Sequence, residues 1–79
     1  MSPALRSQLL VFQKTELTEY HIYSAIARQL KEDANRQVLE KIARDELAHA
    51  RLWQKYTGQE VSPSRLTISF YTFISRLLG

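Results

Sequence analysis

Residues 35–56, with the sequence NRQVLEKIARDELAHARLWQKY, decide the fold of this chain. Mostly apolar side chains recur in it at alternating intervals of four and three, the spacing of a helix face that packs against a neighbour. The residues at this spacing are Asn35, Leu39, Ile42, Glu46, His49, Trp53 and Tyr56. The pattern predicts a helix whose apolar face is interrupted, near its middle, by a carboxylate and an imidazole.

The segment before it repeats the same spacing over residues 5–30. Its members are Leu5, Leu9, Phe12, Glu16, Glu19, Tyr23, Ile26 and Leu30. Two glutamates therefore occupy positions where a packed helix normally places hydrophobic side chains. We call these two sets of residues the seams of the first and second helices.

Proline, glycine and short polar residues indicate where the helices begin and end. Ser2-Pro3 and Ser62-Pro63 each combine an N-cap residue with a proline suited to the first helical position. Gly58 is typical of a helix C-terminus, and Asp33 or Asn35 is expected to cap the second helix. Three helices and no strand are thus predicted, at about residues 3–31, 34–57 and 63–78.

Composition limits the class of protein. The 79 residues make one domain, 1–79, with only a small core of its own, and the absence of cysteine excludes disulfides and thiolate metal sites. The net charge of +3 is spread along the helices without a basic block, so we expect no nucleic-acid partner. No signal peptide or membrane-spanning run is visible, and we expect a cytoplasmic protein.

A short connection between two helices makes them antiparallel neighbours. Reflection of the second helix about a connection near residue 32 places Glu46 and His49 beside Glu16 and Glu19. A buried carboxylate without a partner is costly, so four such groups at one level are best explained by a shared cation. We therefore predict Glu16, Glu19, Glu46 and His49 as metal ligands.

The stretch Glu46-Leu47-Ala48-His49 has the pattern Glu-x-x-His, which points both side chains to the same side of a helix, one turn apart. A carboxylate can bridge two metal ions, and a neutral imidazole binds one. An oxygen-rich site with one histidine for each metal suits iron or manganese better than structural zinc.

These residues also carry a resemblance. Glu16 with Tyr23, followed by IARDELAH over residues 42–49, resembles the ferritin-like, rubrerythrin-type diiron family. Residues 16–58, with Trp53-x-x-Tyr56-Thr57-Gly58 at their end, look more narrowly like the rubrerythrin-like domain that precedes vacuolar-iron-transporter-type membrane domains. The resemblance covers most of the chain.

The resemblance implies that Glu16, Glu46 and His49 are catalytic ligands and that Tyr23 lies near the metals without binding them. It implies oxidation of Fe(II) by O2 or peroxide. The family has four long helices with two half-sites, whereas this chain supplies one half. We therefore expect a ferritin-like half-bundle that dimerises, at least, into a four-helix bundle with two iron ions per dimer, manganese being the alternative metal.

Two other classes of function remain open. The chain could be a non-catalytic module that senses or delivers iron for a membrane transporter domain. It could also be a metal-free module whose polar seam specifies dimer pairing, with Glu19 bound to an arginine across the dimer. His21 lies on the polar face of the first helix, where we expect it to be solvated.

The third helix is unusually apolar. Its residues between Arg65 and Arg76 are hydrophobic, serine or threonine, so its surface is poorly suited to water. We expect it to pack against the hairpin or a partner chain. The alternative is contact with a membrane surface or a following domain, since the helix is too short to span a bilayer.

Overall fold

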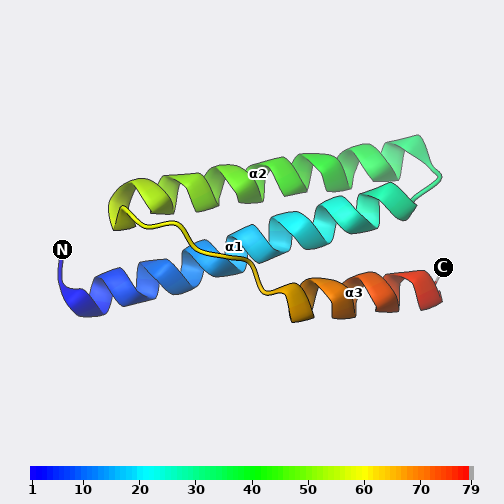
Figure 1. The fold of residues 1–79 in the computed structure, drawn as a ribbon. Helices are drawn as coiled ribbons and strands as arrows, with labels where there is room; N and C mark the ends of the chain where they lie inside the picture. Colours follow the sequence, from blue (N-terminus) through cyan, green and yellow to red (C-terminus); the bar gives the residue numbers. More distant parts are fainter. Residues whose placement is uncertain (79) are drawn as a thin grey trace.

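The computed structural model describes residues 1–78, which form three α-helices and no strand. α1 (Pro3–Gln29) and α2 (Asp33–Thr57) run in opposite directions and pack side by side, and α3 (Arg65–Leu78) lies along the other side of α1 (Figure 1). Within the described residues α2 and α3 do not contact each other. The predicted all-α hairpin with a short third helix is confirmed, and the three helices form an open layer with α1 in the middle.

The ends of the hairpin follow from local chemistry. Ser2 caps α1 as predicted, because its Oγ accepts a hydrogen bond from the backbone N–H of Leu5 at 3.1 Å. α1 ends at Gln29, two residues earlier than predicted, since Leu30 is already extended. Gly58 ends α2 with a φ of 67°, a left-handed conformation in which only glycine avoids a steric penalty.

Two predicted helix starts are wrong. Neither Asp33 nor Asn35 caps α2, because Glu32 is the N-cap residue, its side chain makes no capping bond, and Asp33 is already helical. The pair Ser62-Pro63 does not open α3, which begins two residues later than predicted. Ser64 takes the capping position instead, since its Oγ accepts the backbone N–H three residues ahead at 3.3 Å.

Small side chains fill the contact between the hairpin helices. Ala27 and Ala43 are each 2% exposed, and Ala50 is 4% exposed. Because these side chains are small, the two backbones can approach closely, and several of the larger seam residues stay exposed. Phe12, Ile42 and Tyr56 are 43%, 36% and 60% exposed. The expectation that Tyr56 is a core residue is therefore wrong for a single chain.

A buried polar contact joins the start of α1 to the end of α2. The side chain of Gln13 is 2% exposed. Its Nε2 donates to the carbonyl oxygen of Gln59 at 2.7 Å, and its Oε1 accepts from the hydroxyl of Thr57 at 2.8 Å. Arg6 also donates to the carbonyl of Thr57, at 3.1 Å. These hydrogen bonds hold the C-terminal end of α2 against α1.

α3 packs on α1 through a side that mixes polar and apolar residues, and its half-buried residues are Thr67, Ile68, Thr72, Ile74 and Ser75. The backbone N–H of Ser64 donates to Thr18 Oγ1 at 2.9 Å, and Ser75 Oγ donates to Gln29 Oε1 at 2.7 Å. No residue of α3 is buried. Its outward stripe is apolar and exposed by 58–86%, and consists of Leu66, Phe70, Phe73 and Leu77. The expected contact with the hairpin is present through α1, but the apolar stripe is uncovered.

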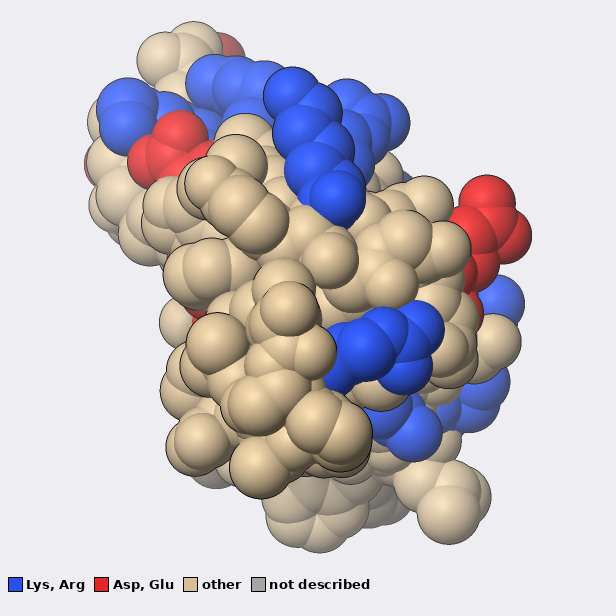
Figure 2. Space-filling model, turned by 90° about the vertical axis from the view of Figure 1, so that its left-hand side faces the viewer, with Lys and Arg blue, Asp and Glu red and all other residues tan. Residues whose placement is uncertain are grey.

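Charge is unevenly distributed over the layer. Figure 2 views the molecule from the end that carries the N-terminus; lysine and arginine side chains gather over its upper and right-hand parts, and the lower left is free of charged groups. None of the described helices combines the length and apolarity that crossing a membrane requires.

Replacement of Gln13 tests the contact at the end of the hairpin. Gln13→Leu should lower the free energy of unfolding by about 1–3 kcal/mol, because the Gln59 carbonyl and the Thr57 hydroxyl lose their buried partner. Urea unfolding followed by circular dichroism measures the loss. Gln8→Leu, at an exposed position of the same helix, is the control, and an equal effect of both changes would contradict this role of Gln13.

Candidate metal centre

The antiparallel packing of the hairpin brings three of the predicted ligands together. Glu16 comes from α1, and Glu46 and His49 come from successive turns of α2. His49 Nδ1 lies 3.3 Å from Glu46 Oε1 and 3.9 Å from Glu16 Oε1. One ligand atom from each residue lies within 4.8 Å of the others. Reflection of the second helix about the connection therefore predicted this meeting correctly.

The carboxylates are more protected from solvent than the imidazole. The side chains of Glu16 and Glu46 are 23% and 17% exposed, and that of His49 is 53% exposed. Glu16 Oε2 is buried without a hydrogen-bond partner among residues 1–78. Such an oxygen destabilises the fold unless something neutralises it. The cluster is thus closed on the side of α1 and open on the side of His49.

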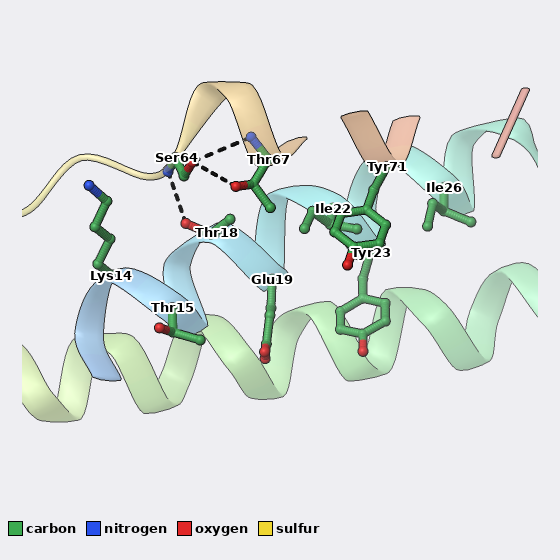
Figure 3. Close-up of a pocket in the computed structure, with 10 residues that line it drawn as sticks. All are labelled: Lys14, Thr15, Thr18, Glu19, Ile22, Tyr23, Ile26, Ser64, Thr67 and Tyr71. Atoms are coloured by element: carbon green, nitrogen blue, oxygen red, sulfur yellow. Dashed lines mark hydrogen bonds between the residues drawn. The ribbon is translucent and has the colours of Figure 1, made fainter. Parts of the chain in front are cut away.

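Glu19, the fourth predicted ligand, is not among the three residues whose ligand atoms converge, but it lies beside Glu46. A hydrogen bond with Glu46 raises the pKa of Glu19 to about 7, and partial burial and the negative charges of Glu46 and Glu16 act in the same direction. In Figure 3 its carboxyl group points from α1 toward α2. Near neutral pH Glu19 is therefore partly protonated, which relieves part of its repulsion with Glu46.

Tyr23 lies one turn beyond Glu19, and both line a groove of about 540 Å³ between α1 and α3 (Figure 3). Lys14 stands at one end of this groove, and Tyr71 of α3 lies on its far side. Tyr23 is thus next to the carboxylate cluster, as the resemblance implies, but makes no contact that would assign it a role in metal binding.

His21 lies outside the cluster, as expected. Its ring meets that of Tyr20 edge-on, with 4.9 Å between the centroids. Partial burial lowers the pKa of His21, and the positive charges of Arg65 and Arg28 lower it further. The two histidines of the chain therefore differ: one faces carboxylates and the other faces arginines.

The donor atoms of the cluster fit a divalent cation. Two carboxylates and one imidazole nitrogen are the mixture that iron and manganese accept, and the unpartnered Glu16 oxygen is the group that a cation would satisfy. Three donors leave coordination positions free for water or for residues of a second chain. The open side at His49 is where such ligands would approach.

Two features of the site have no counterpart in the sequence patterns. The groove beside Glu19 exists because Ser64 bonds to Thr18, residues that are 46 positions apart in the chain. The raised pKa of Glu19 depends on its distances to Glu46 and Glu16, which helix spacing does not specify.

Glu19 predicts a pH dependence of stability. The pKa of Glu19 is about 7 in the folded chain and 4.5, its ordinary value, in the unfolded chain. Between pH 4.5 and pH 7, Glu19 is therefore mostly protonated in the folded chain and mostly ionised in the unfolded chain. The contribution of Glu19 to the free energy of unfolding is therefore fully present below pH 4.5 and is lost as the pH rises through 7. Glu19→Gln, which still donates a hydrogen bond but cannot ionise, should remove this fall in the free energy of unfolding.

Urea titrations of the chelator-treated protein at several pH values measure this effect. Glu60→Gln, at an exposed position of the segment after α2, is the control and should keep the wild-type dependence. If the Glu19 and Glu60 variants show the same slope of unfolding free energy against pH, the proton is not held at Glu19.

Comparison with known proteins provides no further identification. No protein-family model, no curated protein and no solved structure matches this chain. The chemistry of the cluster must therefore be argued from its own residues and their geometry.

Proposed function

We propose that this chain is a diiron-carboxylate protein that binds iron and oxidises Fe(II) with O2 or peroxide at a site shared by two copies. The observation that carries this proposal is the convergence of Glu16, Glu46 and His49, with a buried and unpartnered oxygen on Glu16. A carboxylate kept from water in this way favours a bound cation. The resemblance to rubrerythrin-type proteins supports iron as that cation.

Each side chain has a distinct part in the proposal. Glu46 lies within 4.8 Å of both other ligands and would supply the carboxylate that two ions share, whereas His49 would offer one nitrogen from the open side. Glu16 supplies a carboxylate from the facing helix, and Glu19 holds a proton that it would release before joining the ligands. Fe(II) is the substrate, and carboxylate ligands stabilise the additional positive charge of Fe(III).

A second copy of the chain is part of the proposal because one hairpin supplies half of the ligands that a diiron bundle requires. The side of the layer that carries the cluster also exposes Phe12, Ile42 and Tyr56. An apolar surface of this kind marks an interaction site in a soluble protein. Two copies packed on this side would cover these residues and bring six ligands together.

A metal-free dimerisation module is the second candidate, and the hydrogen bond between Glu19 and Glu46 favours it. A shared proton reduces the negative charge of the cluster without any cation. In that case the polar residues of the seams would serve to specify pairing. The chain could also bind iron and deliver it to another protein without oxidising it, which is the non-catalytic alternative to the proposed function.

Anaerobic titration with Fe(II) tests the proposed function. We expect binding of about one iron per chain, followed by an increase in near-ultraviolet absorbance when O2 is admitted. Glu46→Ala and His49→Ala should each abolish binding and oxidation, because each removes a ligand of the half-site. His21→Ala is the control, since His21 lies outside the cluster and should leave both signals unchanged.

The same titration separates the candidates. Stoichiometric binding with no absorbance change would favour a delivery module over an oxidase. Absence of binding, with a melting temperature that Fe(II) and Mn(II) leave unchanged, would contradict the iron proposal and leave the dimerisation module.

A charge on the exposed apolar side tests the requirement for two copies. Ile42→Arg should convert the dimer to a monomer and lower the iron bound per chain, because the guanidinium would face the apolar side of the partner. Ala48→Arg introduces the same charge at an exposed position on the outer side of α2 and should do neither. Analytical ultracentrifugation measures the mass, and a monomeric wild-type chain with full iron binding would contradict the shared site.

A further inference from the structure

A second groove runs between α1 and α2 on the side of the layer away from the carboxylate cluster. Its volume is about 290 Å³, and Ala27 and Ala43 form part of its lining. Arg28 of this groove follows Glu19 by nine residues, which places the two about 180° apart around α1. Because the alanines are small and nearly buried, the groove is a depression between the two helices.

Matching sets of polar residues form the two walls. α1 contributes Tyr20, Ser24 and Arg28, spaced by four residues, and α2 contributes Arg36, Glu40 and Arg44 at the same spacing. Residues four apart follow one another along one side of a helix. Residues with three guanidinium groups and two hydroxyl groups therefore line a common space together with a single carboxylate residue.

The carboxylate neutralises only one of the arginines. Arg36 Nε lies 3.4 Å from Glu40 Oε1, and Arg36 also pairs with Asp33. Within residues 1–78, Arg28 and Arg44 have no ion-pair partner, and the hydroxyls of Tyr20 and Ser24 make no hydrogen bond to the protein. The groove thus keeps two positive charges and two hydrogen-bond donors that no protein group uses.

Neighbouring residues strengthen the positive character of this side. Arg65 of α3 and Arg28 both act on His21, whose pKa is lowered by burial and then by these two charges. Arg65 is therefore a further positive charge close to Arg28 on this side of α1. An anion that approached from this side would meet attraction before it reached the groove.

We propose that this groove binds a phosphate group through Arg28, Arg44 and the hydroxyls of Tyr20 and Ser24. Guanidinium groups match phosphate oxygens with paired hydrogen bonds, and the hydroxyls can supply further donors to the remaining oxygens. A carboxylate has fewer acceptor oxygens and would leave some of these donors unused. The phosphate can belong to a soluble molecule or to a lipid headgroup.

Titration of the isotope-labelled protein with inorganic phosphate, followed by NMR of backbone amides, tests the soluble source. We expect saturable shifts in residues 20–28 and 36–44. Vesicles of phosphatidylcholine with and without phosphatidic acid test the lipid source by co-sedimentation. Saturation by phosphate, or sedimentation that requires phosphatidic acid, supports the site and identifies the source.

Matched charge removals decide whether the groove is responsible. Arg28→Gln and Arg44→Gln should each weaken binding about tenfold, since each removes a charged hydrogen-bond donor. Arg51→Gln removes an equal charge from an exposed position of α2 outside the groove and should have little effect. Equal weakening by all three variants, or no saturable binding of either probe, would overturn the proposal. Glu46→Ala should leave phosphate binding intact, so the two proposed sites can fail separately.

Discussion

The close approach of α1 and α2 over small side chains is the constraint on which the rest of the structure depends. Ala27, Ala43 and Ala50 are almost fully buried between the helices, whereas Leu9 is the one bulky seam residue among residues 1–78 that is buried. The hydrogen bonds of Gln13 hold the two helices in one register. That register places Glu16 opposite the Glu-x-x-His pattern, and it leaves the carboxylate cluster on one side of the hairpin and the arginine-lined groove on the other.

The carboxylate cluster shows how the chain accommodates like charges that packing has brought together. Glu16, Glu19 and Glu46 cannot all be ionised at low cost when they share a partly buried space. A proton on Glu19 relieves its repulsion with Glu46 and Glu16, but it leaves the buried Oε2 of Glu16 without a hydrogen-bond partner. A divalent cation would relieve both, which is why we favour metal binding over a seam that serves only for pairing.

Helix spacing predicted what depends on regular geometry. The meeting of Glu16 with Glu46 and His49 follows from seam periodicity and a short connection, both of which are visible in the sequence. The start of α3 was not predicted correctly from the sequence. A tertiary hydrogen bond between Ser64 and Thr18 outweighs the local preference of Ser62-Pro63 for starting a helix. Local patterns cannot include a partner that lies 46 residues away in the chain.

The placement of α3 was unpredictable for a related reason. An amphipathic helix normally buries its apolar side, and this expectation assumes that the described chain provides a surface to cover it. Here serine and threonine side chains anchor α3 to α1, and the stripe that begins at Leu66 faces outward. The sequence showed that the helix is unusually apolar but contained no information about which side would meet α1.

The anchoring of α3 has a consequence for motion. Its contacts with the rest of the chain are with α1 alone, and none of its side chains is buried. Opening of such a segment exposes little additional apolar surface, so it costs less than unfolding of the hairpin. Amide hydrogens of α3 would then exchange with solvent ahead of those in α1 and α2. The groove beside Glu19 would open and close with this helix on a timescale independent of the carboxylate cluster.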